Sequence, residues 1–237
     1  MFDASSDLYD LIYSAFKDYP AEAAAVAGLL RTHHPGCHSL LDVGCGTGTH
    51  ARLLAGEYGF AVDGLDRNAD FVRIATAKHP GGRFYRADMG DFHLPQRYDA
   101  VISLFSSIGY VMTTDALART LACFAEHLAE GGIVVVEPWF EPGALTDGYV
   151  MTHRAETEGL RVVRTSRTEI VGRTSRLHFT YEVETADDVK TLHEEHELGL
   201  FTEDEMRAGF HAAGLNVAYD PVGLTGRGLY VARRRED

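Results

Sequence analysis

Cysteine is scarce in this sequence of 237 residues, which contains only Cys37, Cys45 and Cys123. Their number is odd and no two have C-x-x-C spacing, which argues against a disulfide framework and favours a reducing compartment. The chain also lacks an apolar run approaching the ~18 residues of a membrane helix, and no charged-then-apolar signal segment opens it. These absences predict a cytoplasmic protein that does not span a membrane.

Basic residues are few, because 22 Lys and Arg stand against 35 Asp and Glu, which gives a formal net charge of −13. The acidic residues are spread along the chain, so we expect no general attraction to nucleic acid or to an anionic membrane. The one dense basic run, Arg233–Arg235, is followed directly by Glu236 and Asp237. That order favours a solvated terminus over a nucleic-acid patch.

Neither a metal-ligand pattern nor a domain linker is evident. His193 and His196 occur in the order His-Glu-Glu-His, but residues three apart in a strand point to opposite faces, so we predict no metal there. No Pro-, Gly- or Ser-rich segment divides the chain. Residues 1–237 are therefore predicted to form a single domain.

What the chain does contain is a glycine-rich turn between an apolar strand and a helix. The strand Leu40–Val43 leads into Gly44, Gly46 and Gly48, and the amphipathic segment Ala51–Tyr58 follows. Glycine accepts backbone angles that a Cβ forbids and lets a ligand lie against bare peptide, so this unit is typical of a nucleotide-cofactor fold. The third glycine of a dinucleotide fingerprint would fall on the threonine after Gly48, which argues against NAD.

An acidic residue ends the next strand, where Phe60–Leu65 is followed by Asp66, and a carboxylate there can accept hydrogen bonds from ribose hydroxyls. The order Asp-Val-Gly-Cys-Gly-Thr-Gly with this acidic strand end resembles motif I and its partner in S-adenosylmethionine-dependent methyltransferases. The resemblance implies S-adenosyl-L-methionine as the cofactor. The cofactor-binding residues it implies are Tyr9, Asp42, Gly44, Gly46, Gly48, Asp66, Arg67, Asp88, Met89 and Leu104.

Two of these assignments carry specific roles and alternatives. In the methyltransferases, an acidic residue at the place of Asp88 accepts from the adenine N6 amine, and the next residue, Met89, packs on the ring. The alternative is that Asp88 caps a helix. Tyr9 stands in a Leu-Tyr-Asp segment that closes over the methionine part of the cofactor in similar enzymes, and the alternative is amphipathic packing within a helix over residues 3–16.

The rest of the chain continues the alternation of strands and helices. Helices are expected over 21–32, 69–79, 114–128 and 203–213, with strands over 83–86, 98–104, 133–137, 215–221 and 228–233. Between residues 149 and 200 the helical period disappears, and strands are expected over 149–155, 160–170, 174–184 and 190–200. We predict an α/β fold, with a Rossmann-like seven-stranded methyltransferase sheet, helices on both faces and an antiparallel sheet inserted at 149–200 as one wall of the acceptor pocket.

Six segments narrow the resemblance to bacterial N,N-dimethyltransferases acting on dTDP-linked 3-amino-deoxysugars in macrolide antibiotic pathways. They are 40–50, 105–110, 124–128, 133–139, 212–215 and 226–229. The resemblance implies N-methylation of a sugar-nucleotide amine. Arg227 would bind the pyrophosphate and Tyr110 would lie beside the amine, unless they are a surface cation and a packing residue.

Further residues are assigned to the acceptor from the same comparison. Tyr110 ranks first, Tyr13 second and His178 third as the catalytic group that handles the proton of the amine. The substrate-binding residues expected are Phe2, Lys17, Ser106, Trp139 and Arg227.

Three departures from that family leave a second acceptor open. Phe2 stands where the family has a tyrosine, the basic glycine loop before Lys17 is shortened, and Trp139-Phe-Glu-Pro replaces Trp-Trp-Phe-Pro. These changes suit a less polar acceptor, so the alternative is C- or N-methylation of an indole-type alkaloid or a cyclodipeptide. A protein that only binds the cofactor and a reductase with an atypical glycine loop are two other hypotheses. A homodimer is a further hypothesis, since oligomeric state is not readable from the sequence.

Overall fold

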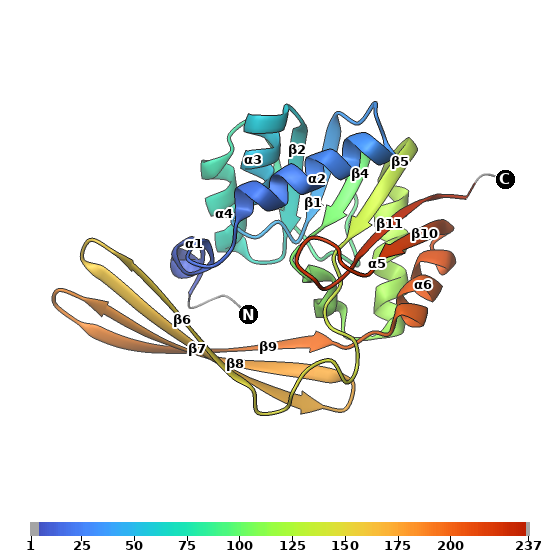
Figure 1. Ribbon diagram of the computed structural model, residues 1–237. Coiled ribbons are helices and arrows are strands. Elements are labelled where there is room, and N and C mark those ends of the chain that lie inside the picture. Colours follow the sequence, from blue (N-terminus) through green and yellow to red (C-terminus); the bar gives the residue numbers. More distant parts are fainter. Residues whose placement is uncertain (1–4, 236–237) are drawn as a thin grey trace.

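The computed structural model describes residues 5–235, and its centre is a seven-stranded sheet (Figure 1). The strands lie in the order β10-β11-β5-β4-β1-β2-β3. Strands β5, β4, β1, β2 and β3 pair in parallel, whereas β11 runs antiparallel to both β5 and β10. Their bounds are β1 Ser39–Val43, β2 Ala61–Asp66, β3 Phe84–Arg86, β4 Tyr98–Ser103, β5 Leu128–Val136, β10 Leu215–Asp220 and β11 Leu229–Arg234.

Helices cover both faces of this sheet. In β1, Leu40 packs in the core beneath α2 and α3, while Leu41 packs in the core beneath α5 and α6, because successive side chains of a strand point to opposite faces. Burial on both faces explains why the parallel strands read as nearly continuous apolar runs. The helices are α1 Tyr9–Ser14, α2 Tyr19–His33, α3 Thr49–Tyr58, α4 Ala69–Lys78, α5 Thr114–Glu126 and α6 Glu203–Ala212, with short 3₁₀ turns η1 Ser6–Leu8 and η2 Ser107–Val111.

The N-terminal segment differs from the single helix expected over 3–16. It consists of the turn η1 and the short helix α1, and residues 1–4 lie outside the described part of the chain. Helix α2 begins two residues before the helix expected over 21–32. Asp18 caps it by accepting from the backbone N–H of Ala21 at 3.0 Å. Pro20 lies in its first turn, where a missing N–H costs no hydrogen bond.

The inserted antiparallel sheet is confirmed. It contains β6 Val150–Thr157, β7 Leu160–Val171, β8 Thr174–Thr185 and β9 Val189–Gly199, paired in that order, and Figure 1 shows it as a layer below the seven-stranded sheet. Ile12 of α1 packs against Val162, Phe179 and Tyr181 on this sheet. The insertion therefore shares its apolar cluster with the N-terminal helix. No helix within residues 5–235 is long and apolar enough to cross a membrane.

Candidate active site

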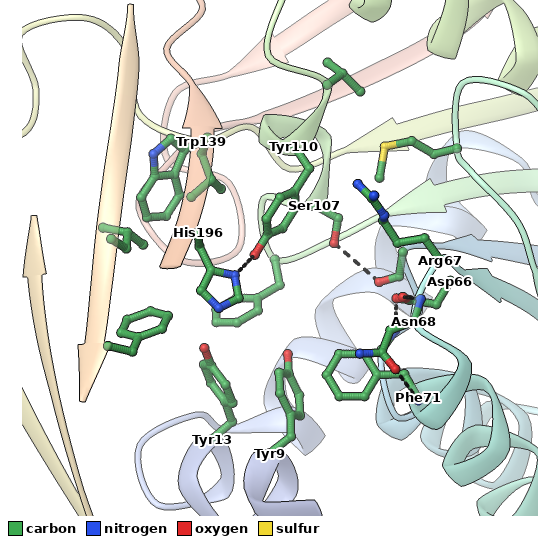
Figure 2. A pocket seen from close by; sticks show the side chains of 18 of the residues that line it. Tyr9, Tyr13, Asp66, Arg67, Asn68, Phe71, Ser107, Tyr110, Trp139 and His196 are labelled. Carbon is green, nitrogen blue, oxygen red and sulfur yellow. Dashed lines mark hydrogen bonds between the residues drawn. The ribbon is translucent and has the colours of Figure 1, made fainter. Parts of the chain in front are cut away.

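A cavity of about 780 Å³ is lined both by residues that follow the parallel strands and by the insertion sheet. Its glycine side is formed by the segments after β1, β2 and β3, and includes Gly46 and Asp66. Its insertion side is formed by β6 to β9 and the segments after β4 and β5, and includes Arg164 and Tyr110. Figure 2 shows side chains from both sides facing the same space. The carboxyl ends of parallel strands are where open α/β sheets bind their ligands.

The three glycines of the β1–α3 turn all have positive φ, at 75° for Gly44, 54° for Gly46 and 74° for Gly48. A Cβ on Gly44 would lie 2.7 Å from the Cβ of Ser107, and one on Gly48 would lie 2.8 Å from the Cβ of Ala75. A Cβ on Gly46 would meet only the hydroxyl of Tyr9, at 4.0 Å. Packing thus requires two of the glycines, whereas Gly46 is the one that leaves space for a ligand against bare backbone.

Asp66 holds this turn from the end of β2. Its Oδ2 accepts from the backbone N–H of Gly46 at 3.0 Å, and its Oδ1 accepts from that of Asn68 at 2.9 Å. Burial raises the pKa of the Asp66 carboxyl, and these backbone hydrogen bonds oppose the rise. Because a carboxylate has about four lone-pair sites, Asp66 keeps acceptors for two ribose hydroxyls.

Other residues predicted for the cofactor line the glycine side of the cavity. The ring of Tyr9 lies 4.3 Å from that of Tyr13 between centroids and 4.9 Å from that of Phe71. Asp88 accepts from the backbone N–H of Gly90 at 2.9 Å, in a turn closed by a bridge to Asp91 rather than at a helix start. The helix-cap alternative for Asp88 is therefore wrong. Arg67 and Met89 also line the cavity.

The segment after β4 has an unusual backbone, with φ of 51° at Phe105 and 63° at Ser106. The backbone N–H of Phe105 donates to Oε2 of Glu137 at 2.6 Å, and the Ser106 hydroxyl donates to the carbonyl of Pro138 at 2.6 Å. Glu137 is 1% exposed, and its Oε1 accepts from Nη2 of Arg227 at 3.2 Å. One buried carboxylate at the end of β5 thus fixes both this loop and the arginine.

A second arginine, Arg164 of β7, is 5% exposed and lines the insertion side. Its guanidinium carbon lies 4.8 Å from the ring centroid of Tyr13 and 4.9 Å from that of Phe179, and its Nη2 donates to Nδ1 of His153 at 3.1 Å. Burial, together with Arg164, lowers the pKa of His153, which keeps that ring a neutral acceptor. The Nε and Nη1 atoms of Arg164 are buried and have no hydrogen-bond partner among the described residues. A buried cation with open donors is suited to binding an anion.

Tyr110 lies in η2, and its hydroxyl is 2.8 Å from Nδ1 of His196 in β9 (Figure 2). Gly109 permits this approach, because a Cβ there would lie 3.0 Å from both the Leu198 side chain and the Cβ of Trp139. Burial raises the pKa of Tyr110 well above its ordinary value, so the phenol is protonated at neutral pH.

Comparison with known proteins identifies the family of this chain. Residues 40–132 match a family model described as a methyltransferase domain. Over 229 residues, the chain is 42% identical to a dTDP-3-amino-3,4,6-trideoxy-alpha-D-glucopyranose N,N-dimethyltransferase from Streptomyces venezuelae, an alignment that covers 95% of this chain and 96% of the relative. The chain belongs to this family of N,N-dimethyltransferases. A second member, the dTDP-3-amino-3,6-dideoxy-alpha-D-glucopyranose N,N-dimethyltransferase of Streptomyces fradiae, is 43% identical over 95% of this chain and 89% of its own length.

Solved structures of methyltransferases share the fold of this chain. DesVI of Streptomyces venezuelae matches with a TM-score of 0.92 and 40% identity, covering 97% of this chain and 98% of that one. CalS10, an amino pentose methyltransferase of Micromonospora echinaspora solved with S-adenosylmethionine bound, matches with a TM-score of 0.87 and 37% identity over 96% of this chain and 97% of that one. The chain is an S-adenosylmethionine-dependent methyltransferase, as predicted, so the reductase and the non-enzymatic hypotheses are wrong.

Some residues predicted from the sequence do not line the cavity. Lys17 donates to Glu22 at 2.8 Å, and its ammonium lies 3.6 Å from the ring centroid of Phe105, so it supports the cavity wall from behind. His178 is a half-buried group between Glu169 at 3.0 Å and Glu195 at 3.2 Å, and it does not line the cavity. The other predicted residues not among those lining the cavity are Asp42, Gly48, Leu104 and Ser106, and Phe2 lies outside the described residues.

Sequence reasoning overlooked Arg164, His196 and Glu137. The sequence did contain one signal for Arg164. It lies two residues after Val162 in a strand, so both side chains point to the same, apolar face. Glu137 was seen only as part of a segment, and its role depends on Phe105 and Arg227, which approach it from distant parts of the chain. No metal site is indicated, since no group of three or more His, Cys, Asp or Glu side chains suited to a metal occurs among residues 5–235.

Proposed function

We propose that this methyltransferase N-methylates the amine of a dTDP-linked amino sugar, the acceptor class named for its relatives. The observation that carries the proposal is Arg164, a buried guanidinium on the insertion side whose Nε and Nη1 lack partners among the described residues. An apolar acceptor would leave that charge buried and poorly solvated, at a cost of several kcal/mol. A diphosphate would satisfy it with charge-assisted hydrogen bonds.

A second cation supports the same assignment. Arg227 lines the cavity, its Nε is also buried without a partner in the described structure, and it is held by Glu137 at 3.2 Å. Burial raises the pKa of Tyr13 and both guanidiniums lower it, and both arginines line the same cavity. Two arginines around one part of the cavity suit the two phosphates of a nucleoside diphosphate.

The reaction requires alignment more than acid or base strength. S-adenosylmethionine supplies a sulfonium methyl group, which the lone pair of the amine takes as the carbon–sulfur bonding pair returns to sulfur. The cofactor would be held by Gly46 against bare backbone, by Asp66 through the ribose and by Asp88 through the adenine amine. On the insertion side, Tyr110 would orient the amine with its lone pair toward the glycine side. Fixing two reactants in this way is worth effective molarities of about 10⁵–10⁸ M.

The indole-type or cyclodipeptide acceptor is the competing candidate, and the aromatic wall of Tyr13, Phe105 and Trp139 is the observation in its favour. The Trp139 indole N–H donates to the Ser175 hydroxyl at 2.8 Å, which holds that ring as a fixed surface. However, a guanidinium over Phe105 at 5.2 Å and another over Tyr13 at 4.8 Å place positive charge on the same wall. We therefore rank the charged acceptor first.

A methyl-transfer assay tests the proposal. S-adenosylhomocysteine release and product mass are measured with dTDP-3-amino-3,6-dideoxyglucose and with a panel of indoles. We expect one or two methyl groups on the sugar amine. Methylation of an indole with none on the sugar nucleotide contradicts the proposal and supports the competing acceptor.

Arg164→Met then tests the site. The variant is expected to raise the KM for the sugar nucleotide roughly 10- to 100-fold, since a hydrogen bond to a charged group is worth about 1.5–3 kcal/mol. The affinity for S-adenosylmethionine is expected to be unchanged. Arg167→Met is the matched control, because Arg167 is exposed on the same strand and does not line the cavity. Equal kinetics of the two variants would remove the role assigned to Arg164.

The proposal extends to the cellular setting. The three cysteines are free thiols, which fits a cytoplasmic location. A homodimer is also proposed, and Val150, which is exposed on the edge strand β6, is the first position at which to look for its contact. Light scattering after size exclusion measures the oligomeric state directly.

A further inference from the structure

We infer that His196 acts on the acceptor amine through Tyr110, as the residue that positions the phenol and receives its proton when the amine must be neutral. The inference rests on the proposed amine acceptor. His196 was not assigned a role from the sequence beyond the rejected metal pattern. His196 itself lines the cavity, and the inference treats it as a positioning residue because its Nδ1 is bonded to the Tyr110 hydroxyl.

The geometry defines a chain of contacts that runs from Tyr110 through His196 to Glu194. The Tyr110 hydroxyl lies 2.8 Å from Nδ1 of His196, and Nε2 of the same ring lies 3.7 Å from Oε2 of Glu194. Glu194 is itself 8% exposed and accepts from the backbone N–H of Ser5 at 3.0 Å and from the Ser5 hydroxyl at 2.8 Å. A carboxylate on the Nε2 side favours the tautomer that carries its proton there. Nδ1 is then the acceptor for Tyr110.

Local packing fixes the position of the His196 ring beside the Tyr110 phenol. Gly109 presses η2 against β9, where a Cβ would lie 3.0 Å from the Leu198 side chain. The ring of Phe179 lies 5.0 Å from that of His196, between centroids, and covers it on the insertion sheet. His196 is 2% exposed. The imidazole therefore has little freedom to leave the phenol.

The charges around His196 keep it neutral until a proton arrives. Burial lowers the pKa of His196, and the Arg164 guanidinium of β7 lowers it further, whereas Glu194 on its own strand raises it. The phenol of Tyr110 faces His196 from η2. Tyr13 of α1 and Tyr181 of β8 are other titratable groups that act on this phenol. Burial raises the pKa of Tyr110, which keeps it protonated. A neutral imidazole beside a protonated phenol is ready to accept, and the Glu194 carboxylate offsets the positive charge that results.

The proton step balances without another reactant. An N–H bond of the ammonium breaks and leaves its electron pair on nitrogen, while the proton binds the Tyr110 oxygen. The O–H bond of Tyr110 breaks at the same time, and its proton binds Nδ1 of His196 to give an imidazolium. Solvent takes that proton later. The step serves an amine that arrives protonated, and it serves again between two successive methylations of one nitrogen.

His196→Gln tests the inference, because glutamine retains a hydrogen-bond acceptor and cannot take a proton at neutral pH. With dTDP-3-amino-3,6-dideoxyglucose as the acceptor, we expect kcat near neutral pH to fall roughly 10- to 100-fold. The deficit should shrink steadily toward about pH 10, where the free amine is already neutral. A larger share of monomethylated product is also expected. His193→Gln is the matched control, since His193 is exposed on the same strand and bonds to Thr180.

Tyr110→Phe is a second variant that tests the same inference if the His196→Gln variant does not fold correctly. It removes only the hydroxyl, and we expect the same pH-dependent deficit, with no further loss when both substitutions are combined. A deficit of constant size at every pH, or a wild-type profile in Tyr110→Phe, overturns the inference. If the wild-type enzyme itself leaves the sugar amine unmethylated, the proposed function fails instead, so the two failures are distinguishable.

Discussion

At the scale of single residues, Asp42 is a buried carboxyl in the core that lowers the stability of the fold near neutral pH. It lies at 2% exposure in β1, directly before the glycine turn, and burial raises the pKa of its carboxyl to about 6. The unfolded chain loses this proton near pH ~3.9, so the folded state binds more protons between about pH 4 and about pH 6. Stability is therefore lost as pH rises through that window. Above it, the buried carboxylate destabilises the fold by about 3 kcal/mol.

Asp42→Asn should remove this penalty. We expect the variant to gain up to about 3 kcal/mol of unfolding free energy near neutral pH, and to gain nothing below about pH 3.5, where both forms are uncharged. Urea unfolding of the wild type and the variant at each pH measures the difference between their unfolding free energies. The titration of all other carboxylates is common to both proteins and cancels in that difference. A gain of equal size at both pH values would show that packing, and not ionisation, separates the two side chains.

Residues also mark the limit of what the sequence predicts. The glycine turn and Asp66 were predictable because their roles depend on local backbone angles and on strand ends. The position of Lys17 was not, since its ammonium is directed by Glu22 in the next helix. The same holds for His178, which glutamates of two neighbouring strands draw to the exposed side of the insertion sheet. Long side chains follow partners that only the folded chain brings near.

At the scale of elements, α1 packs on the insertion sheet and also contributes to the glycine side of the cavity. Ile12 is 2% exposed and packs on Val162, Phe179 and Tyr181, while Tyr9, at the start of the same helix, lies over Gly46. A helix of six residues has little stability of its own, so its position depends on this packing. The cofactor side of the cavity thus depends on contacts made by the insertion.

Ile12→Ala should therefore weaken cofactor binding. Removing the side chain leaves a cavity under α1, and we expect the Kd for S-adenosylmethionine to rise about tenfold, or roughly 1.4 kcal/mol. Calorimetric titration measures this. Leu30→Ala in α2 is the control, because Leu30 is fully buried in the main core away from the cavity, and it should lower the melting temperature without changing the Kd. Equal Kd values for wild type and Ile12→Ala would mean that α1 holds its place without the insertion sheet.

Elements were predicted more accurately than the contacts between them. The strands of the insertion lie within two residues of the segments expected, because alternating Thr, Val, Arg and Tyr with turn-like breaks encodes a strand locally. That this sheet packs on α1 and brings His196 to Tyr110 was not predictable, since both contacts join residues far apart in the chain. The alternation of residues along a strand predicts which face is buried, but it does not predict which helix or strand packs on that face.

At the scale of the whole molecule, the two sheets differ in how they are buried. Leu40 and Leu41 of β1 and Val101 and Ile102 of β4 are all fully buried, with helices over both faces. In β6, at the edge of the insertion sheet, Ala155 is the one buried side chain. Local opening follows the density of buried contacts, so the two sheets should open at different free energies.

Hydrogen exchange across the chain measures this difference. We expect the amides of β1 and β4 to exchange last, at the free energy of global unfolding, and those of β6 to exchange first. The shared cluster of Ile12 with Val162 and Phe179 further predicts that α1 opens together with the insertion sheet, because neither can bury its apolar face without the other. If the amides of α1 instead exchange at the same free energy as those of β1, this helix does not open together with the insertion sheet. Exchange of all the strands at one free energy would instead make residues 1–237 a single cooperative unit with no weaker part.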